Sequence, residues 1–166
     1  MIYAHWESFV VFLIRKTCEY INSEQISYKN VRKEIALYAL EPQMKYLSGN
    51  AELNSRARFY DEFIELYNNP VYIDCGKVVS AKSNLNYKQL KHMLCCLGIE
   101  MPPGVESGEG IIEKLVAYRN KIAHGENSIV VHEDDVICFT KEIVYFFDEL
   151  IIRTRQYLKE KQYLKQ

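Results

Sequence analysis

Apolar residues recur every three or four positions along most of the chain, which is the spacing of one face of an α-helix. The pattern is clearest at the start, where polar Ser8, Arg15 and Glu19 fall on the face opposite the apolar stripe. It predicts an amphipathic helix of about five turns over residues 1–21. The inward-facing stripe of this helix is Trp6, Phe9, Val10, Leu13, Ile14, Thr17 and Ile21.

The same spacing predicts further helices, whose ends are marked by residues that start or stop a helix. Asn30 can cap the second helix, which Pro42 is expected to end or bend. Gly98 and Gly125 each follow the last residue of a later helix. The acidic run 133–135 suits the positive N-terminal end of the final one. These helices are expected at 31–40, 55–67, 87–97, 111–124 and from 133 to about 151.

The remaining stretches lack this period. Within 71–86, the most irregular part, residues 71–73 and 78–79 are candidates for short extended pieces, as are residues 128–131. Residues 101–104 predict a loop, and the polar end of the chain, 153–166, is predicted to fray.

The predicted fold is all-α. A chain of 166 residues with 48% hydrophobic and 26% charged positions fits one domain over residues 1–166, with a core that needs no disulfide or structural metal. We expect an antiparallel helical bundle of about five to six helices with one irregular middle section.

Charge and cysteine usage narrow the function classes. The net charge of −1 provides no global attraction for nucleic acid, so any RNA contact must come from a local patch. The five cysteines include no C-x-x-C spacing, which argues against both a disulfide framework and a zinc site. We therefore expect no metal site and no cofactor. The first 21 residues are apolar but are interrupted by His5, Glu7, Arg15 and Lys16, so we do not expect a membrane span. We expect the protein to be cytoplasmic.

Arg119 is the first candidate for chemistry, because it falls on the apolar stripe of its helix, where an unpaired charge is costly. Two interpretations remain open from the residues alone. In the structural interpretation, the guanidinium either reaches the surface or pairs with a carboxylate across the bundle. In the functional interpretation, it binds a phosphate.

His124 occupies the last helical position before Gly125, where the helix dipole favours a cation and an imidazole suited to acid–base work. A simple capping role fits the position as well. Asn120 lies one turn earlier on the same face, within reach of His124 or of a ligand. Arg119 and His124 point roughly 140° apart on an ideal helix, so they can meet one phosphate only if the helix ends at His124 or two chains each contribute a pair.

The run Arg119-Asn120-Lys121-Ile122-Ala123-His124 resembles the Arg-x4-His signature of the HEPN superfamily. The opening His5-Trp6-Glu7-Ser8-Phe9 and the run Ser83-Asn84-Leu85 before a short helix are similar to one prokaryotic, HWE-containing branch of it. That branch is expected to carry another helix before this opening, so the N-terminus here is expected to be shortened.

The resemblance implies an all-α homodimer in which two motifs face each other and cleave RNA without metal, as in toxin–antitoxin or phage-defence systems. Arg119 would bind the scissile phosphate, His124 would transfer a proton and Asn120 would orient either one. Glu7 and Lys121 are candidates to line the site. An antitoxin protein is an implied partner, although Glu126 stands where some HEPN toxins carry a modifiable Tyr.

Two other functions remain open. The chain can be a non-catalytic HEPN module that binds RNA, nucleotide or a protein partner as a dimeric scaffold, or a plain helical adaptor with a chance motif.

Two weaker signals also have alternative interpretations. Gly104, Gly108 and Gly110 suggest a phosphate loop, but no strand precedes them and a flexible loop explains them better. Two basic clusters could follow RNA or could be solvated helix faces. They are Lys29, Arg32 and Lys33, and separately Arg153, Arg155 and Lys159.

Overall fold

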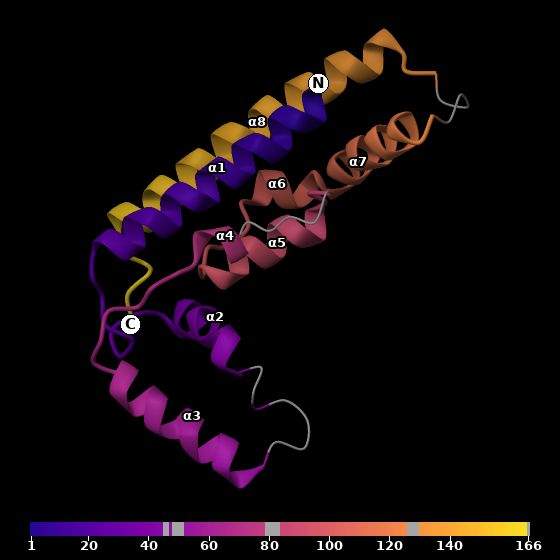
Figure 1. Ribbon diagram of the computed structural model, residues 1–166. Helices are drawn as coiled ribbons and strands as arrows, with labels where there is room; N and C mark the ends of the chain where they lie inside the picture. Colours follow the sequence, from indigo (N-terminus) through magenta and orange to yellow (C-terminus); the bar gives the residue numbers. More distant parts are fainter. Residues whose placement is uncertain (45–46, 48–51, 79–83, 126–129, 166) are drawn as a thin grey trace.

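A computed structural model describes residues 1–44, 47, 52–78, 84–125 and 130–165 (Figure 1). Within these residues the regular structure is helical, and the only β-type pairing consists of isolated bridges. The helices are α1 (Ile2–Ser23), α2 (Lys33–Met44), α3 (Leu53–Leu66), α4 (Cys75–Val78), α5 (Tyr87–Cys96), α6 (Pro103–Ser107), α7 (Glu109–Ala123) and α8 (Glu133–Lys159).

The six predicted helices are present as α1, α2, α3, α5, α7 and α8, and α4 and α6 add two short ones. The helix α2 continues to Met44, so Pro42, which was expected to end or bend it, does not end it. The predicted loop at 101–104 runs into α6, because Pro103 occupies the first helical turn, where its fixed φ is favourable. Val78 lies in α4, not in an extended piece. Residue 79 and residues 128–129 lie outside the described residues.

The helix α1 lies alongside α8, whose first turns extend past the N-terminus of α1 (Figure 1). Trp6 of α1 stacks on Phe147 of α8 near one end, and Tyr20 of α1 meets Tyr163, just beyond α8, near the other. The two helices therefore run in the same direction, so the bundle that was predicted to be antiparallel contains one parallel pair. Because α1 and α8 are not neighbours in the sequence, no short turn forces them to be antiparallel.

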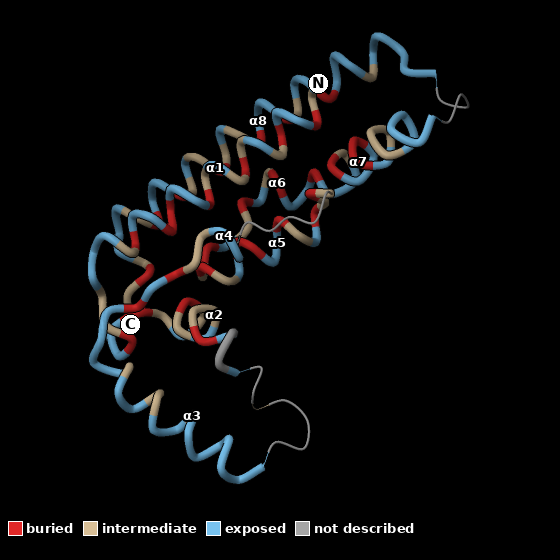
Figure 2. Tube along the Cα trace, in the orientation of Figure 1, coloured by how far each residue is buried: buried red, intermediate tan, exposed pale blue. Residues whose placement is uncertain are grey.

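The core lies between this helix pair and a second layer made of α4, α5, α6 and α7 (Figure 2). Trp6 is fully buried there, and its ring meets Phe146 edge-on at 6.3 Å. The helix α6 approaches α8 so closely that a Cβ at Gly108 would overlap the Phe146 ring and one at Gly104 would overlap Tyr145. These glycines therefore serve helix packing, and both the phosphate-loop and the flexible-loop interpretations are wrong at these two positions.

The helix α3 lies apart from the two layers and contains no buried residue (Figure 2). Phe63 and Leu66 pack against the core, whereas Ile64 and Tyr67 are exposed. The hydrophobic stripe of this helix is therefore only partly covered.

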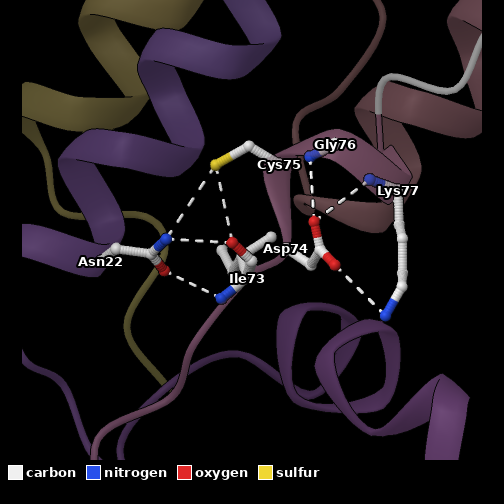
Figure 3. Close-up of polar contacts among 6 residues, drawn as sticks. All are labelled: Asn22, Ile73, Asp74, Cys75, Gly76 and Lys77. Atoms are coloured by element: carbon white, nitrogen blue, oxygen red, sulfur yellow. Dashed lines mark hydrogen bonds and ion pairs between the residues drawn. The ribbon is translucent and has the colours of Figure 1, made fainter.

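The stretch between α3 and α4 is fixed to the end of α1 by one side chain (Figure 3). Asn22 donates to the carbonyl oxygen of Ile73 at 3.0 Å and accepts from its N–H at 2.9 Å. Asp74 then accepts from the N–H groups of Gly76 and Lys77 and so starts α4. The ion pair with Lys77 holds the pKa of Asp74 below its ordinary value. Val71 and Ile73 are buried as a result, without forming a strand.

Three segments far apart in the sequence meet beyond the end of α1. Antiparallel bridges pair Ser27 with Pro70 and Val31 with Leu164. The backbone N–H of residue 165 donates to the carbonyl of residue 30 at 2.8 Å, and that of residue 32 donates to the carbonyl of residue 163 at 2.9 Å. The segment 26–32 is therefore held between residues 67–71 and residues 163–165.

The predicted fraying of residues 153–166 is wrong over the described part of that range. The helix α8 continues to Lys159, and the side chains of Tyr157 and Tyr163 are buried. The Tyr157 hydroxyl donates to the carbonyl oxygen of Leu97. These two aromatic side chains help to anchor a largely polar segment, because each removes a large apolar ring from water.

Candidate functional site

The site begins with a short segment, residues 84–87, that joins three helices. The N–H of Leu85 donates to the Tyr3 hydroxyl at 2.7 Å, and the indole N–H of Trp6 donates to the Leu85 carbonyl at 3.2 Å. The N–H of Tyr87 donates to Glu113 of α7 at 3.1 Å. Asn86 caps α5 by accepting from the N–H of Gln89. The first turns of α1 thus fix the backbone on which Asn84 stands.

Arg119 of α7 is half-buried and directed at this segment. Its Nη1 donates to the side-chain oxygen of Asn84 at 2.7 Å and to that of Asn120 at 2.9 Å. Its guanidinium also lies over the Tyr3 ring, 5.0 Å from the ring centroid, in cation–π geometry. The side chain is therefore oriented by two amides and an aromatic face.

None of the carboxylates in the described residues lies within ion-pair distance of Arg119. The two hydrogen bonds that Arg119 makes within the described residues both use Nη1. Its Nε and Nη2 therefore have no acceptor among these residues. Neutral amides orient a guanidinium without cancelling its charge. The positive charge is thus available to an anion, and the expectation of a carboxylate partner across the bundle is not met within the described part of the chain.

Tyr3 links this arginine to Glu7. The Tyr3 hydroxyl donates to Oε1 of Glu7 at 3.0 Å, one helical turn further along α1. Burial raises the pKa of Tyr3 above its ordinary value, against the opposing influence of the Arg119 charge. The phenol therefore stays neutral, which allows it to accept from Leu85 and donate to Glu7 at once. Glu7 itself is half-buried.

His124 lies at the other end of the motif, as the residue that caps the C-terminus of α7. Its backbone N–H donates to the Asn120 carbonyl at 3.0 Å, and its side chain is exposed. Gly125 follows with φ of 69°, the left-handed conformation that ends helices and favours glycine. The predicted stop at Gly125 is confirmed, and it leaves the imidazole accessible to a ligand.

The structure brings only part of the predicted constellation together. Asn120 orients Arg119, and no hydrogen bond joins its side chain to His124 within the described residues. Lys121 is exposed in the last turn of α7, where a cation complements the helix dipole. Asn84 and Tyr3 were missed as site residues. The Asn84 run carried a family resemblance, but no local signal in the sequence connects Tyr3 with Arg119.

The described residues contain neither a cluster of metal-binding side chains nor a helix that could span a membrane. Among their His, Cys, Asp and Glu side chains, no group of three or more is placed to bind a metal ion. Within the described part of the chain, no helix is both long enough and apolar enough to span a membrane.

Comparison with known proteins decides the family. A family model described as RiboL-PSP-HEPN matches residues 1–156, which include the motif, the opening helix and most of α8. The chain belongs to the RiboL-PSP-HEPN family. No curated protein and no solved structure matches this HEPN chain. Because HEPN domains are often ribonucleases, membership supports a role in RNA or nucleotide chemistry. The end of this HEPN chain, beyond residue 156, lies outside the matched range.

Proposed function

We propose that this protein is a metal-independent endoribonuclease, the toxin of a toxin–antitoxin or phage-defence system, with a composite site across a homodimer. The observation that carries the proposal is the state of Arg119. It is oriented by Asn84, Asn120 and Tyr3, yet its charge meets no carboxylate among the described residues. A pre-oriented guanidinium with free N–H groups suits the phosphate of an RNA strand.

The chemistry follows from these groups. The 2′-hydroxyl of the RNA attacks the adjacent phosphorus, so a bond forms from the 2′-oxygen to phosphorus and the bond to the 5′-oxygen breaks. His124 accepts the proton of the attacking 2′-hydroxyl or donates one to the leaving 5′-oxygen, and water takes up or supplies the other proton. Arg119 stabilises the negative charge that builds on the phosphate oxygens. These side chains supply the charge stabilisation and one proton transfer, which is why we expect cleavage without metal.

A homodimer is proposed because Arg119 and His124 diverge. Arg119 is directed at α1 and residue 84, whereas His124 is exposed at the tip of α7. Apolar side chains are also exposed close to this tip. Ile122 is 60% exposed and Ile137 of α8 is 59% exposed. A second copy would cover such side chains and bring its own His124 toward the first copy's Arg119.

RNA cleavage by the purified protein tests the proposal. Arg119→Ala and His124→Ala should each lower the cleavage rate by about 10²–10⁴-fold, as loss of a general acid–base or charge-stabilising group does. The matched controls Arg56→Ala and His92→Ala remove exposed residues of the same types and should leave the rate unchanged. Cleavage should persist in EDTA, and expression of the wild type should arrest bacterial growth. Intact RNA after incubation with folded wild type would reject catalysis.

Mixed dimers test the composite site. If one subunit supplies Arg119 and the other His124, a dimer of Arg119→Ala with His124→Ala holds one intact site. Random mixing of the two inactive variants should then restore roughly one quarter of wild-type activity. If both residues act within one chain, every mixed dimer is inactive and no activity returns.

The alternative is a non-catalytic HEPN module that binds RNA, nucleotide or a protein partner as a dimeric scaffold. The observation in its favour is that Nη1 of Arg119 already has two acceptors, as in an arginine that holds a fold together. Under this function Arg119→Ala lowers the unfolding free energy, and His124→Ala has no effect on RNA integrity or growth.

A further inference from the structure

A basic hollow lies at the meeting of the three segments beyond α1, away from the motif. Its volume is about 560 Å³. We refer to this hollow as the basic groove. Its lining residues are Tyr28, Lys29, Val31, Arg32, Lys33, Glu34, Ala36, Tyr67, Leu164 and Lys165. Of the lining residues, Tyr28 and Val31 are buried, whereas the three lysines are exposed.

The charge of the groove differs from that of the whole protein. It contains four cations and the single carboxylate of Glu34, whereas the chain carries a net charge of −1. Arg32 lies 3.3 Å from Glu34, so these two largely compensate each other. Lys29, Lys33 and Lys165 make no ion pair with any carboxylate in the described residues. Their positive charges therefore remain for an anionic ligand.

The tertiary structure distinguishes the two basic clusters that the sequence left open. In the cluster at 153–159, Arg153 is held by Glu100 at 2.6 Å, so part of its charge is compensated. The cluster at 29–33 instead surrounds a hollow and gains a third exposed lysine, Lys165, from the far end of the chain. A solvated helix face does not account for cations gathered from two ends of the sequence around one concavity.

The basic groove has a neighbouring hollow. This second hollow of about 630 Å³, lined by Gln25, Ile26, Ser27, Asn30, Leu164 and Lys165, adjoins it and shares its last two residues. Lys165 thus stands between two hollows, the second of which offers uncharged polar side chains. A track of this kind suits an extended chain of phosphates and bases better than a compact anion, and a concave track does not suit a flat membrane surface.

We propose that the basic groove binds single-stranded RNA, with phosphates on Lys29, Lys33 and Lys165 and a base stacked on Tyr67. Tyr67 lines the groove and is 42% exposed, and bases stack on tyrosine whatever their identity. The choice of RNA over an acidic peptide depends on the proposed function and on this aromatic ring.

The groove is a second contact, separate from the site of cleavage. It lies beyond the C-terminal end of α1, whereas Arg119 contacts Tyr3 near the N-terminal end. The 22 residues of α1 separate the two by roughly 30 Å. The groove therefore holds RNA without touching the scissile phosphate in the same subunit, and its loss should weaken binding and leave the chemical step alone.

The test measures RNA binding in the absence of cleavage. Full-length protein with His124→Ala is titrated into a 5′-fluorescein oligouridylate, and anisotropy is followed at several salt concentrations. Adding Lys29→Ala, Lys33→Ala and Lys165→Ala should weaken binding at least about tenfold and lower the slope of log affinity against log salt by about 2. Tyr67→Ala alone should weaken binding about fivefold to a hundredfold. The control triple Arg56→Ala, Lys88→Ala and Lys141→Ala removes the same charge from exposed sites elsewhere and should bind like the parent.

Three results would overturn the proposal that the groove binds RNA. They are no RNA binding by the parent, unchanged RNA affinity in the groove triple, or an equal loss of RNA affinity in the control triple. Displacement of the RNA by polyglutamate as readily as by unlabelled RNA would assign the groove to acidic peptides instead. These outcomes are separate from the proposed catalysis. If the protein binds RNA through the groove but cleaves none, the groove proposal stands and the endoribonuclease proposal is rejected. If the protein cleaves RNA and the groove triple binds with unchanged affinity, the endoribonuclease proposal stands and the groove proposal is rejected.

Discussion

The side-chain oxygen of Asn84 accepts a 2.7 Å hydrogen bond from Nη1 of Arg119, across 35 positions of sequence. Asn84 is the residue beside Leu85, which the Tyr3 hydroxyl and the Trp6 indole hold against α1. The orientation of the candidate catalytic arginine therefore depends on the docking of a segment from outside the motif. This relationship gives the first prediction.

Asn84→Asp should separate the structural role of Arg119 from its role toward phosphate. A carboxylate in place of the amide would form an ion pair with the guanidinium and neutralise the charge that an RNA phosphate needs. We expect unfolding free energy at or above that of the wild type, with a cleavage rate reduced at least about tenfold. Urea unfolding and RNA cleavage are measured on the same preparation.

The companion variant Asn84→Ala removes the hydrogen bond and adds no charge. It should lower the unfolding free energy by about 1–2 kcal/mol, because the bond involves a charged donor in a half-buried setting. Cleavage should fall less than in Arg119→Ala, since Asn120 and Tyr3 still orient the guanidinium. Equal activity in the Asp and Ala variants would show that the charge of Arg119 is not what the reaction uses.

Gly108→Ala should destabilise the fold through overpacking. The added methyl group would overlap the Phe146 ring, so α6 and α8 must separate, at a cost of about 1–3 kcal/mol. Gly110→Ala is the matched control, because nothing lies within 4 Å of a Cβ there, and alanine in this helical position should be neutral or stabilising. Thermal and urea unfolding compare the two. A Gly108 variant as stable as wild type would mean that α6 does not pack as described.

Tyr163→Ala should cost about 3 kcal/mol or more, because it removes a buried aromatic ring. Its ring contacts Tyr20 of α1 and Tyr157 of α8, so the loss is expected to loosen the end of the molecule where the basic groove lies. Tyr72→Ala, at a position that is 70% exposed, is the control. A frayed C-terminal segment would instead make the two variants equally stable in urea.

The start of α8 should contribute stability that depends on pH. Asp135 hydrogen-bonds the Lys114 ammonium of α7 at 2.9 Å, and this contact holds the pKa of Asp135 below its ordinary value. A carboxyl whose pKa is lowered by folding stabilises the fold above its unfolded pKa, near 4, and loses this effect as pH falls through the folded pKa. The melting temperature of the wild type should therefore exceed that of Asp135→Asn at neutral pH, and the two should converge below about pH 4.

The neighbouring variant Asp134→Asn is the control for this pH dependence. Asp134 lies in the same first turn of α8 but makes no ion pair within the described residues. It should show a smaller difference from wild type across the same pH range. A gap between wild type and Asp135→Asn that persists unchanged in acid would mean that the Lys114 contact does not form in solution.

Some features of the fold and of the candidate site could be predicted from the sequence, because they depend on residues that are close together along the chain. Apolar spacing gave the six main helices, since residues three and four apart share a helix face whatever the rest of the chain does. The stop at Gly125 was predictable for a similar reason, because the left-handed turn with φ of 69° is a local conformation that glycine adopts readily. The run from Arg119 to His124 likewise identified the family, which the match over residues 1–156 confirmed.

Other features depend on contacts between distant segments, and only the tertiary structure decided them. The parallel pairing of α1 with α8, the burial of Tyr163 and the partners of Arg119 all join segments that no local pattern relates. Composition made the end of the chain look frayed, but a tyrosine is stabilised by whichever apolar surface the fold offers it, and that surface comes from elsewhere in the sequence. The sequence alone determined which helices form and where the motif ends, because hydrogen bonds within a helix are local. Which side chains surround Arg119, and which lysines share a groove, was decided by packing between helices, because those distances exist only once the chain has folded.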